Sequence, residues 1–111
     1  MSEFEAVVRQ TGSTAVMDLK GQIDSGADRN LSEAYEKATQ NGATCILLNF
    51  AEVDYINSTG IALVVGLLAQ ARASGREIRA CGLSDHYKEI FEITRLADFV
   101  SIFPDEASAV A

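Results

Sequence analysis

Residues 44–50 form a nearly unbroken apolar segment, and this segment limits the possible folds of the chain more than any other. Such a segment is typical of a strand that is buried on both faces in a parallel region of a sheet. Parallel strands require crossover connections, which are usually helices. Helical patterns lie on both sides of the segment, over residues 25–40 and 58–74. The sequence therefore predicts an α/β fold with this strand at the centre of the sheet.

The rest of the chain continues this alternation of strands and helices. Residues 4–10 and 15–23 predict an antiparallel pair of strands joined by a turn at Gly12 and Ser13, and the second strand has one face in water. Further strands are predicted over 77–81 and 99–103, a helix follows residue 84, and Pro104 fits the first position of a short final helix. The predicted order is ββαβαβαβα, in a single domain over residues 1–111. Its mixed sheet has four or five strands with helices packed on it.

The ends of the predicted helices carry capping residues. Asp24 or Ser25 caps the first helix, Asn41 and Gly42 end it, and Ser84 or Asp85 caps the third. Residues 61–69, in the second helix, are apolar almost all round. We therefore expect the second helix to be the most buried one.

The start of the second helix has a distinctive position in this fold. In open parallel sheets, functional loops lie beyond the carboxyl ends of the strands. Residues 51–57 are predicted to form such a loop after the central strand, so Ser58 lies at this rim, as does Asp24 at the end of the second strand. Ser58 fits a helix cap, and the start of a helix also favours an anion such as a phosphate group. Residue type alone leaves both interpretations open.

The composition argues against several classes of partner. The formal net charge of −7 is unfavourable for binding nucleic acid or an anionic membrane surface. No apolar run reaches the ~20 residues that a membrane-spanning helix needs, and no secretion signal is present, so we expect a cytoplasmic protein without direct membrane insertion. The two cysteines, Cys45 and Cys81, lie in apolar strand patterns, which predicts buried, reduced thiols without a function.

The motifs of common enzyme classes are absent. The sequence holds neither glycine-rich nucleotide motif, and Ile56 stands where a Gly-x-Ser-x-Gly elbow around Ser58 would need glycine. His86 is the single histidine, and no spacing of acidic residues or cysteines suggests a metal site. We therefore expect no catalytic residues, no metal and no cofactor.

Five segments of the chain form a recognisable series: LKGQID at 19–24, ILLNF at 46–50, VDYINSTGI at 53–61, ARASG at 71–75 and ITRL at 93–96. In this order and spacing they resemble the STAS domain family, and more narrowly the bacterial anti-sigma factor antagonists. Each is a weak signal alone, but their order and spacing are specific, and the resemblance covers almost the whole chain. It implies a STAS-like α/β fold.

The resemblance also implies a phosphorylation site. The family's motif is Asp-Ser-[Ser/Thr]-Gly, and its first hydroxyl residue accepts the phosphate. That role falls on Ser58. Thr59 and Gly60 match the motif, whereas Asn57 stands where the family usually has Asp. Asn49, at the expected end of the central strand, likewise replaces a frequent Asp.

The family's function is partner switching. The unphosphorylated antagonist binds an anti-sigma factor, which is a serine kinase of the histidine-kinase-like ATPase fold, and thereby frees the sigma factor. Phosphorylation of Ser58 would separate the pair, and a PPM-type serine phosphatase would restore the binding form. This resemblance implies a regulatory protein, not an enzyme.

The partner-binding surface is expected at the rim of the sheet. Its members are Asp24, Tyr55, Ile56, Asn57, Thr59 and Gly60, around Ser58. Asp24 could pair with a cation of the partner or cap the next helix, and residue type does not distinguish these roles. An alternative function is a docking module that is not phosphorylated and regulates a membrane transporter or another complex. A weaker one is a sensor of a small ligand.

Overall fold

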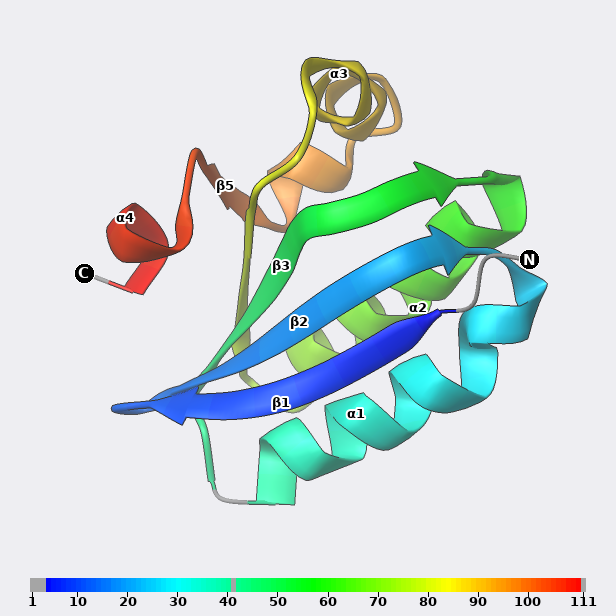
Figure 1. The fold of residues 1–111 in the computed structure, drawn as a ribbon. Coiled ribbons are helices and arrows are strands. Elements are labelled where there is room, and N and C mark those ends of the chain that lie inside the picture. The colour runs from blue at the N-terminus through cyan, green and yellow to red at the C-terminus, as the bar shows by residue number, and fades with distance from the viewer. Residues whose placement is uncertain (1–3, 41, 111) are drawn as a thin grey trace.

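The computed structural model describes residues 4–40 and 42–110, which fold into a five-stranded sheet with helices on both faces (Figure 1). The element order ββαβαβαβα is confirmed, with two short 3-10 turns added to it. The elements are β1 (Glu5–Thr11), β2 (Thr14–Ile23), η1 (Ser25–Ala27), α1 (Asp28–Gln40), β3 (Cys45–Ile56), α2 (Ser58–Ala73), β4 (Glu77–Cys81), α3 (Asp85–Ile93), η2 (Leu96–Asp98), β5 (Ser101–Phe103) and α4 (Glu106–Val110).

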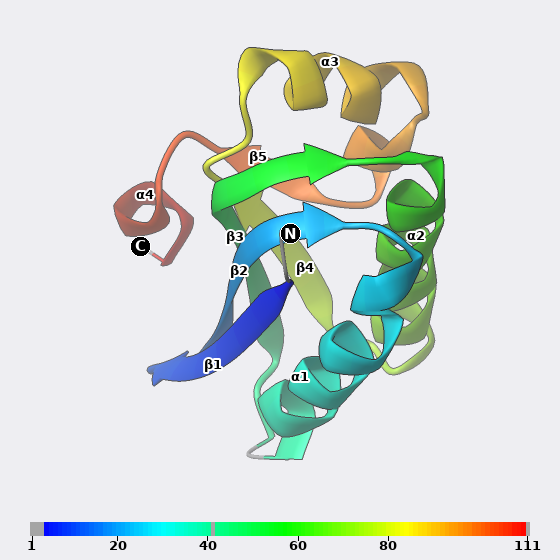
Figure 2. The same cartoon turned by 45° about the vertical axis from the view of Figure 1, so that its right-hand side comes forward.

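The strands lie in the sheet in the same order as in the chain, β1-β2-β3-β4-β5. The pair β1–β2 is antiparallel, as predicted, and the three other pairs are parallel. Two views at 45° show α1 and α2 on one face of the sheet and α4 on the other (Figures 1 and 2). The carboxyl ends of β2 and β3 consequently point the same way, toward the starts of η1 and α2.

The main core lies between the sheet and the helices α1, α2 and α3. Alternate residues of β2 and β3 point into it, because successive side chains of a strand face opposite sides of the sheet. From α3, the ring of Phe91 packs edge-on against Phe50 of β3, with 5.9 Å between the ring centroids. Fully buried members of this core include Met17, Ile23, Ile46 and Phe91.

The opposite face of the sheet carries a smaller second core. Val16, Leu47 and Cys81 are fully buried there beneath Ala109 of α4. The prediction that the second strand has one wet face is therefore wrong around Val16. The reason is that α4, at the far end of the described chain, packs across this face of the sheet.

The central strand is longer than predicted. Residues 51–57 were expected to form a loop, but β3 continues to Ile56. The continuation pairs with β2, for example Lys20 with Glu52 and Ile23 with Ile56, across two irregularities in register. Because β4 accompanies β3 only as far as Asn49, the last part of β3 pairs on one side only.

The second helix is less buried than its composition predicts. α2 buries one face through residues that include Val64, Leu67 and Leu68, but Ala62 and Val65 on its other side are exposed. It covers one face of the sheet and is not enclosed by other elements. α2 nevertheless buries five of its 16 residues, against four of 13 in α1, so the prediction that it is the most buried helix holds, but only by a narrow margin.

The remaining helix ends agree largely with the sequence. Ser84 caps α3 by accepting a hydrogen bond from the N–H of Tyr87 at 3.3 Å. Gly42 has a φ of +73°, as expected after a helix, while Asn41 lies outside the described residues. Pro104 lies two residues before α4, not at its first position. No helix in the described ranges has the length and apolar character to cross a membrane.

Candidate partner-binding site

The junction between β3 and α2 forms the centre of the candidate site. Asn57 has an extended backbone and caps α2, because its side-chain oxygen accepts a hydrogen bond from the N–H of Gly60 at 2.8 Å. Its carbonyl accepts the first helical bond, from Ile61 at 2.9 Å. The capping role open to Ser58 in the sequence therefore belongs to Asn57, and Ser58 is the first residue of the helix.

The Ser58 side chain therefore does not cap the helix. It is exposed, and its hydroxyl makes no hydrogen bond to any described residue. Thr59 is exposed beside it. The two N–H groups that follow, those of Gly60 and Ile61, are already bonded to Asn57. The Ser58 hydroxyl is thus accessible at the positive end of a 16-residue helix.

Gly60 allows the end of β2 to approach this junction closely. A Cβ atom on Gly60 would lie 1.9 Å from the carbonyl oxygen of Ile23, a separation that no real side chain could adopt. That carbonyl accepts a hydrogen bond from the N–H of Asn57 at 3.2 Å. The match of Gly60 to the family motif therefore has a steric reason, since any larger residue would push β2 and α2 apart.

Tyr87 of α3 supports the junction from the other side. Its buried hydroxyl accepts a hydrogen bond of 2.8 Å from the N–H of Ile56, the last residue of β3. Because β4 has already ended, this N–H has no strand partner on that side. The sequence gives no local sign of this bond, because it joins residues far apart in the chain.

The remaining predicted residues lie around the same rim with different exposures. Asp24 is half-buried and caps η1, where its carboxylate accepts a hydrogen bond from the N–H of Gly26 at 2.9 Å. Ile56 is buried, whereas Tyr55 is 51% exposed. The contact between Asn57 and Ile23 brings Asp24, the residue after Ile23, to the same rim as Ser58. All seven predicted site residues thus belong to the ends of β2 and β3 and the start of α2.

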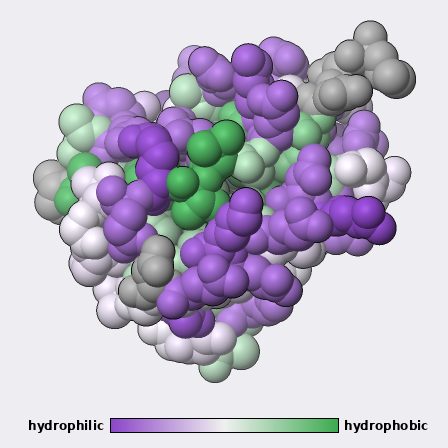
Figure 3. Space-filling view, turned by 60° about the horizontal axis from the view of Figure 1, so that its bottom comes forward, coloured by the Kyte–Doolittle hydropathy of each residue, from purple (hydrophilic) through white to green (hydrophobic). Residues whose placement is uncertain are grey.

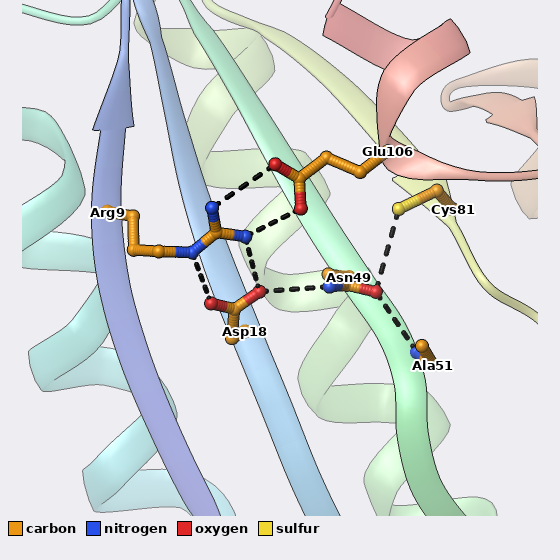
Figure 4. Close-up of polar contacts among 6 residues, drawn as sticks. All are labelled: Arg9, Asp18, Asn49, Ala51, Cys81 and Glu106. Carbon is orange, nitrogen blue, oxygen red and sulfur yellow. Dashed lines mark hydrogen bonds and ion pairs between the residues drawn. The ribbon is translucent and has the colours of Figure 1, made fainter.

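Asn49 belongs to a different cluster, on the face of the sheet that α4 covers. Its amide donates a hydrogen bond to Asp18 at 2.9 Å, and its oxygen accepts one from the N–H of Ala51 at 3.1 Å (Figure 4). The thiol of Cys81 points at the same oxygen, at 3.6 Å. Because β3 extends to Ile56, Asn49 is not at the end of the strand, and its side chain does not reach the rim.

The same cluster attaches α4 to the sheet. Arg9 of β1 forms ion pairs with Asp18 of β2 at 2.5 Å and with Glu106 of α4 at 2.6 Å (Figure 4). The hydrogen bonds from Arg9, together with the one from Asn49, hold the pKa of the Asp18 carboxyl below its usual value despite partial burial. An aspartate at position 49 would instead place a second negative charge against Asp18, so the neutral amide of Asn49 suits this position.

The cysteines are buried, free thiols, in agreement with the sequence. Burial raises the pKa of Cys81 to about 11, and Glu106 contributes to the same direction. Burial also raises the pKa of Cys45. His86 is exposed on α3, with its ring 5.0 Å from that of Tyr87. Within the described residues, no three His, Cys, Asp or Glu side chains are grouped as a metal site would require.

Comparison with known proteins connects this geometry to a family. A family model described as "STAS domain" matches residues 5–109. The anti-sigma-B factor antagonist of Staphylococcus aureus (strain NCTC 8325 / PS 47) is 33% identical over 82 residues, which are 74% of this chain and 76% of that protein.

Solved structures show the same fold. The anti-sigma factor antagonist SpoIIAA in its unphosphorylated form superposes with a TM-score of 0.72 at 21% identity, covering 97% of this chain and 94% of that chain. The phosphorylated form of the Bacillus cell fate determinant SpoIIAA gives a TM-score of 0.71 at 24% identity, covering 97% and 96%. The fold of this chain therefore matches both forms of that protein about equally.

Proposed function

Because this chain belongs to the STAS domain family, we propose that it is an anti-sigma factor antagonist that works as a partner switch controlled at Ser58. In this function, the unphosphorylated chain binds an anti-sigma factor, a serine kinase of the histidine-kinase-like ATPase fold. Phosphorylation of Ser58 releases it, and a PPM-type phosphatase reverses the modification. The name of the 33% identical relative supports the first part of this proposal.

One observation carries the choice of Ser58 as the switch. Asn57 caps α2, so the Ser58 hydroxyl is exposed and uncommitted at the first helical position. A kinase supplies its own base and metal, so the acceptor needs only to present a hydroxyl in reach. The Ser58 oxygen would take the γ-phosphoryl group of ATP, ADP would leave, and the hydroxyl proton would pass to the kinase base. Phosphorylation would not disturb the cap.

The expected effect of the phosphate follows from its charge. A phosphate group adds about −1.5 to −2 charges at neutral pH. On Ser58 it would place this charge and its bulk in the middle of the rim surface, between Asp24 and Tyr55. A penalty of ~3 kcal/mol would weaken partner binding about 100-fold. The start of α2 can accommodate the same charge in the free protein, because the helix dipole favours an anion there.

Asn57 is expected to adjust this switch without disabling it. The side-chain oxygen that caps α2 is present in both Asn and Asp, so the missing carboxylate does not cost the helix its cap. It removes one negative charge beside the phosphate. In a solvent-exposed place this lowers the repulsion in the phosphorylated form by about 1 kcal/mol.

The central experiment is phosphorylation by the cognate kinase followed by site mapping. We expect Ser58→Ala to abolish labelling and keep full binding, and Ser58→Glu to weaken binding at least tenfold. Thr59→Ala is the matched control, because Thr59 is equally exposed one residue later, and it should still be labelled. If Ser58→Ala is labelled like the wild type, or Ser58→Glu binds as tightly, the switch is rejected. The docking-module alternative, for which a transporter would be captured in place of a kinase, then remains.

The two roles of Asp24 can be separated with a pair of variants. Asp24→Asn keeps a side-chain oxygen that can accept the bond from Gly26 but loses the charge, whereas Asp24→Ala loses both. We expect Asp24→Ala to reduce the free energy of unfolding by ~1 kcal/mol and Asp24→Asn to reduce it little. A loss of affinity for the kinase in both variants would assign the carboxylate to a cation of the partner. Unchanged affinity in Asp24→Asn would show that Asp24 is a cap only.

A further inference from the structure

The outer edge of β1 is available for pairing. β1 forms hydrogen bonds with β2 alone, at one side of the sheet. Near its ends, the Asn30 side chain donates to the carbonyl of Phe4 at 3.0 Å, and the Gln10 side chain donates to the carbonyl of Gly12 at 3.1 Å. Between these points, no other strand of the described residues pairs with the edge formed by residues 5–9. Such edges are usually protected, because they can pair with another strand.

Apolar side chains accompany this edge. Val7 is 56% exposed at its middle, although it is a large hydrophobic residue. Between β1 and α1 lies a groove of about 430 Å³, whose lining includes Ala6, Val8, Asn30, Glu33, Ala34 and Lys37. Figure 3 looks onto the side of the molecule where β1 and α1 lie and shows hydrophobic side chains gathered in a hollow among hydrophilic ones. An edge of this kind can gain affinity from both backbone bonds and apolar contact.

We propose that a second copy of this chain binds at this edge, with the two β1 strands antiparallel and the two-fold axis at Val7. This register places Val7 opposite Val7 of the other copy, Ala6 opposite Val8, and Glu5 opposite Arg9. Apolar residues then face apolar residues, and opposite charges face each other at both ends. Directly opposed side chains of antiparallel strands are the contacts that stabilise such a pair.

Neighbouring two-fold registers lack this complementarity. A centre at Ala6 places Glu5 opposite Val7, and a centre at Val8 places Val7 opposite Arg9, so each buries an apolar residue against a charge. Within a single chain, Glu5 forms no ion pair with another described residue, while Arg9 uses four of its five N–H donors on Asp18 and Glu106. One donor is left for Glu5 of the second copy.

The groove beneath the edge is compatible with the same partner. Its lining carries two acidic residues, Glu5 and Glu33, and one basic residue, Lys37, so two copies related by a two-fold axis present both signs to each other. The shared surface of five residue pairs is small, and we expect a dissociation constant on the order of 0.1 mM. Because the strands run in opposite directions, the two Ser58 sites face away from each other and both remain accessible. The inference does not depend on the proposed function.

Disulfide trapping tests the register directly. Residues facing each other across an antiparallel pair have Cα atoms about 4.5–5.5 Å apart, a separation that a disulfide spans. We expect Val7→Cys to cross-link to its own copy under mild oxidation, as seen on a non-reducing gel. Thr11→Cys is the matched control, because Thr11 is exposed on the same face of the same strand. In the proposed register it lies roughly 26 Å from its copy and should cross-link at least tenfold more slowly.

Charge variants test the pairing of Glu5 with Arg9. In the Val7→Cys background, Glu5→Lys should slow cross-linking at least tenfold, because it repels Arg9 of the other copy, and Glu5→Gln should slow it less. Equal cross-linking of Val7→Cys and Thr11→Cys would overturn the register. A wild-type chain that stays monomeric at 1 mM in sedimentation equilibrium would overturn the dimer. The native thiols, Cys45 and Cys81, are buried and serve as the wild-type baseline.

Discussion

Among single residues, two buried tyrosines differ in whether their hydroxyl group forms a hydrogen bond. The hydroxyl of Tyr87 accepts a hydrogen bond from the N–H of Ile56 at the junction between β3 and α2. The hydroxyl of Tyr35, on α1, has no hydrogen-bond partner among the described residues although it is buried. Losing the partner of a buried N–H is costly, whereas removing an unsatisfied hydroxyl is not.

The matched variants Tyr87→Phe and Tyr35→Phe should therefore change stability in different ways. We expect Tyr87→Phe to lower the free energy of unfolding by about 1–2 kcal/mol, and Tyr35→Phe to leave it unchanged or raise it slightly. Urea denaturation measures both. Hydrogen exchange at the Ile56 amide should become faster in Tyr87→Phe only. Equal destabilisation by the two variants would contradict the assignment of the hydrogen bond.

Residue chemistry explains which parts of the site the sequence could predict. The order of Asn57, Ser58 and Gly60 predicts a capped start of a helix here, because capping acts over three residues. That Asn57, and not Ser58, takes the cap depends on backbone angles that residue type does not determine. The contact with Tyr87 was not predictable, since a hydrogen bond between distant parts of the chain leaves no local pattern.

At the scale of elements, the predicted types were right, but lengths and burial depended on neighbours. β3 was expected to end near Phe50, yet it continues because β2 is long enough to pair with it as far as Ile56. α2 was expected to be the most buried helix because its first half is apolar, and it leads α1 only narrowly, since one side of it is exposed. Its exposed apolar residues lie next to the proposed partner-binding site, where such residues are common.

α4 covers Cys81, and the ion pair of Glu106 with Arg9 attaches α4 to the sheet. The reactivity of Cys81 should therefore depend on this ion pair. Glu106→Gln should change the free energy of unfolding by less than about 1 kcal/mol, since the ion pair with Arg9 is partly exposed. It should nevertheless let α4 open more often, so a thiol reagent should modify Cys81 several-fold faster. The reaction is measured in a Cys45→Ala background, where Cys81 is the single cysteine.

The matched control is Glu89→Gln, at an exposed position of α3, which should leave the labelling rate unchanged. Because burial raises the pKa of Cys81 to about 11, the rate for the closed protein should continue to rise with pH well above the range of an ordinary thiol. If the labelling rate of the Cys45→Ala protein levels off near pH 9, Cys81 is not covered by α4.

For the whole molecule, the ion pairs of Arg9 with Asp18 and Glu106 connect β1, β2 and α4. Because acid protonates the Asp18 carboxylate, low pH should reduce the stability of the fold. The folded pKa of Asp18 lies below the unfolded value. The resulting stabilisation is fully present above about pH 4 and is lost as the pH falls through the folded pKa. Asp18→Asn should lower the free energy of unfolding by about 1 kcal/mol at pH 7. The difference from wild type should shrink at pH 3 in urea denaturation. A difference of equal size at both pH values would contradict this linkage.

The sequential order of the strands favours folding of the sheet during synthesis on the ribosome. Each strand pairs with the one synthesised just before it, from β1 to β5. The nascent sheet can therefore grow at one edge as the polypeptide emerges, and no strand has to wait for a later one to be inserted between it and its neighbour. The antiparallel hairpin β1–β2 is complete first and acts as a template for the parallel strands. α4, which is synthesised after all five strands, then covers the face of the sheet opposite α1 and α2.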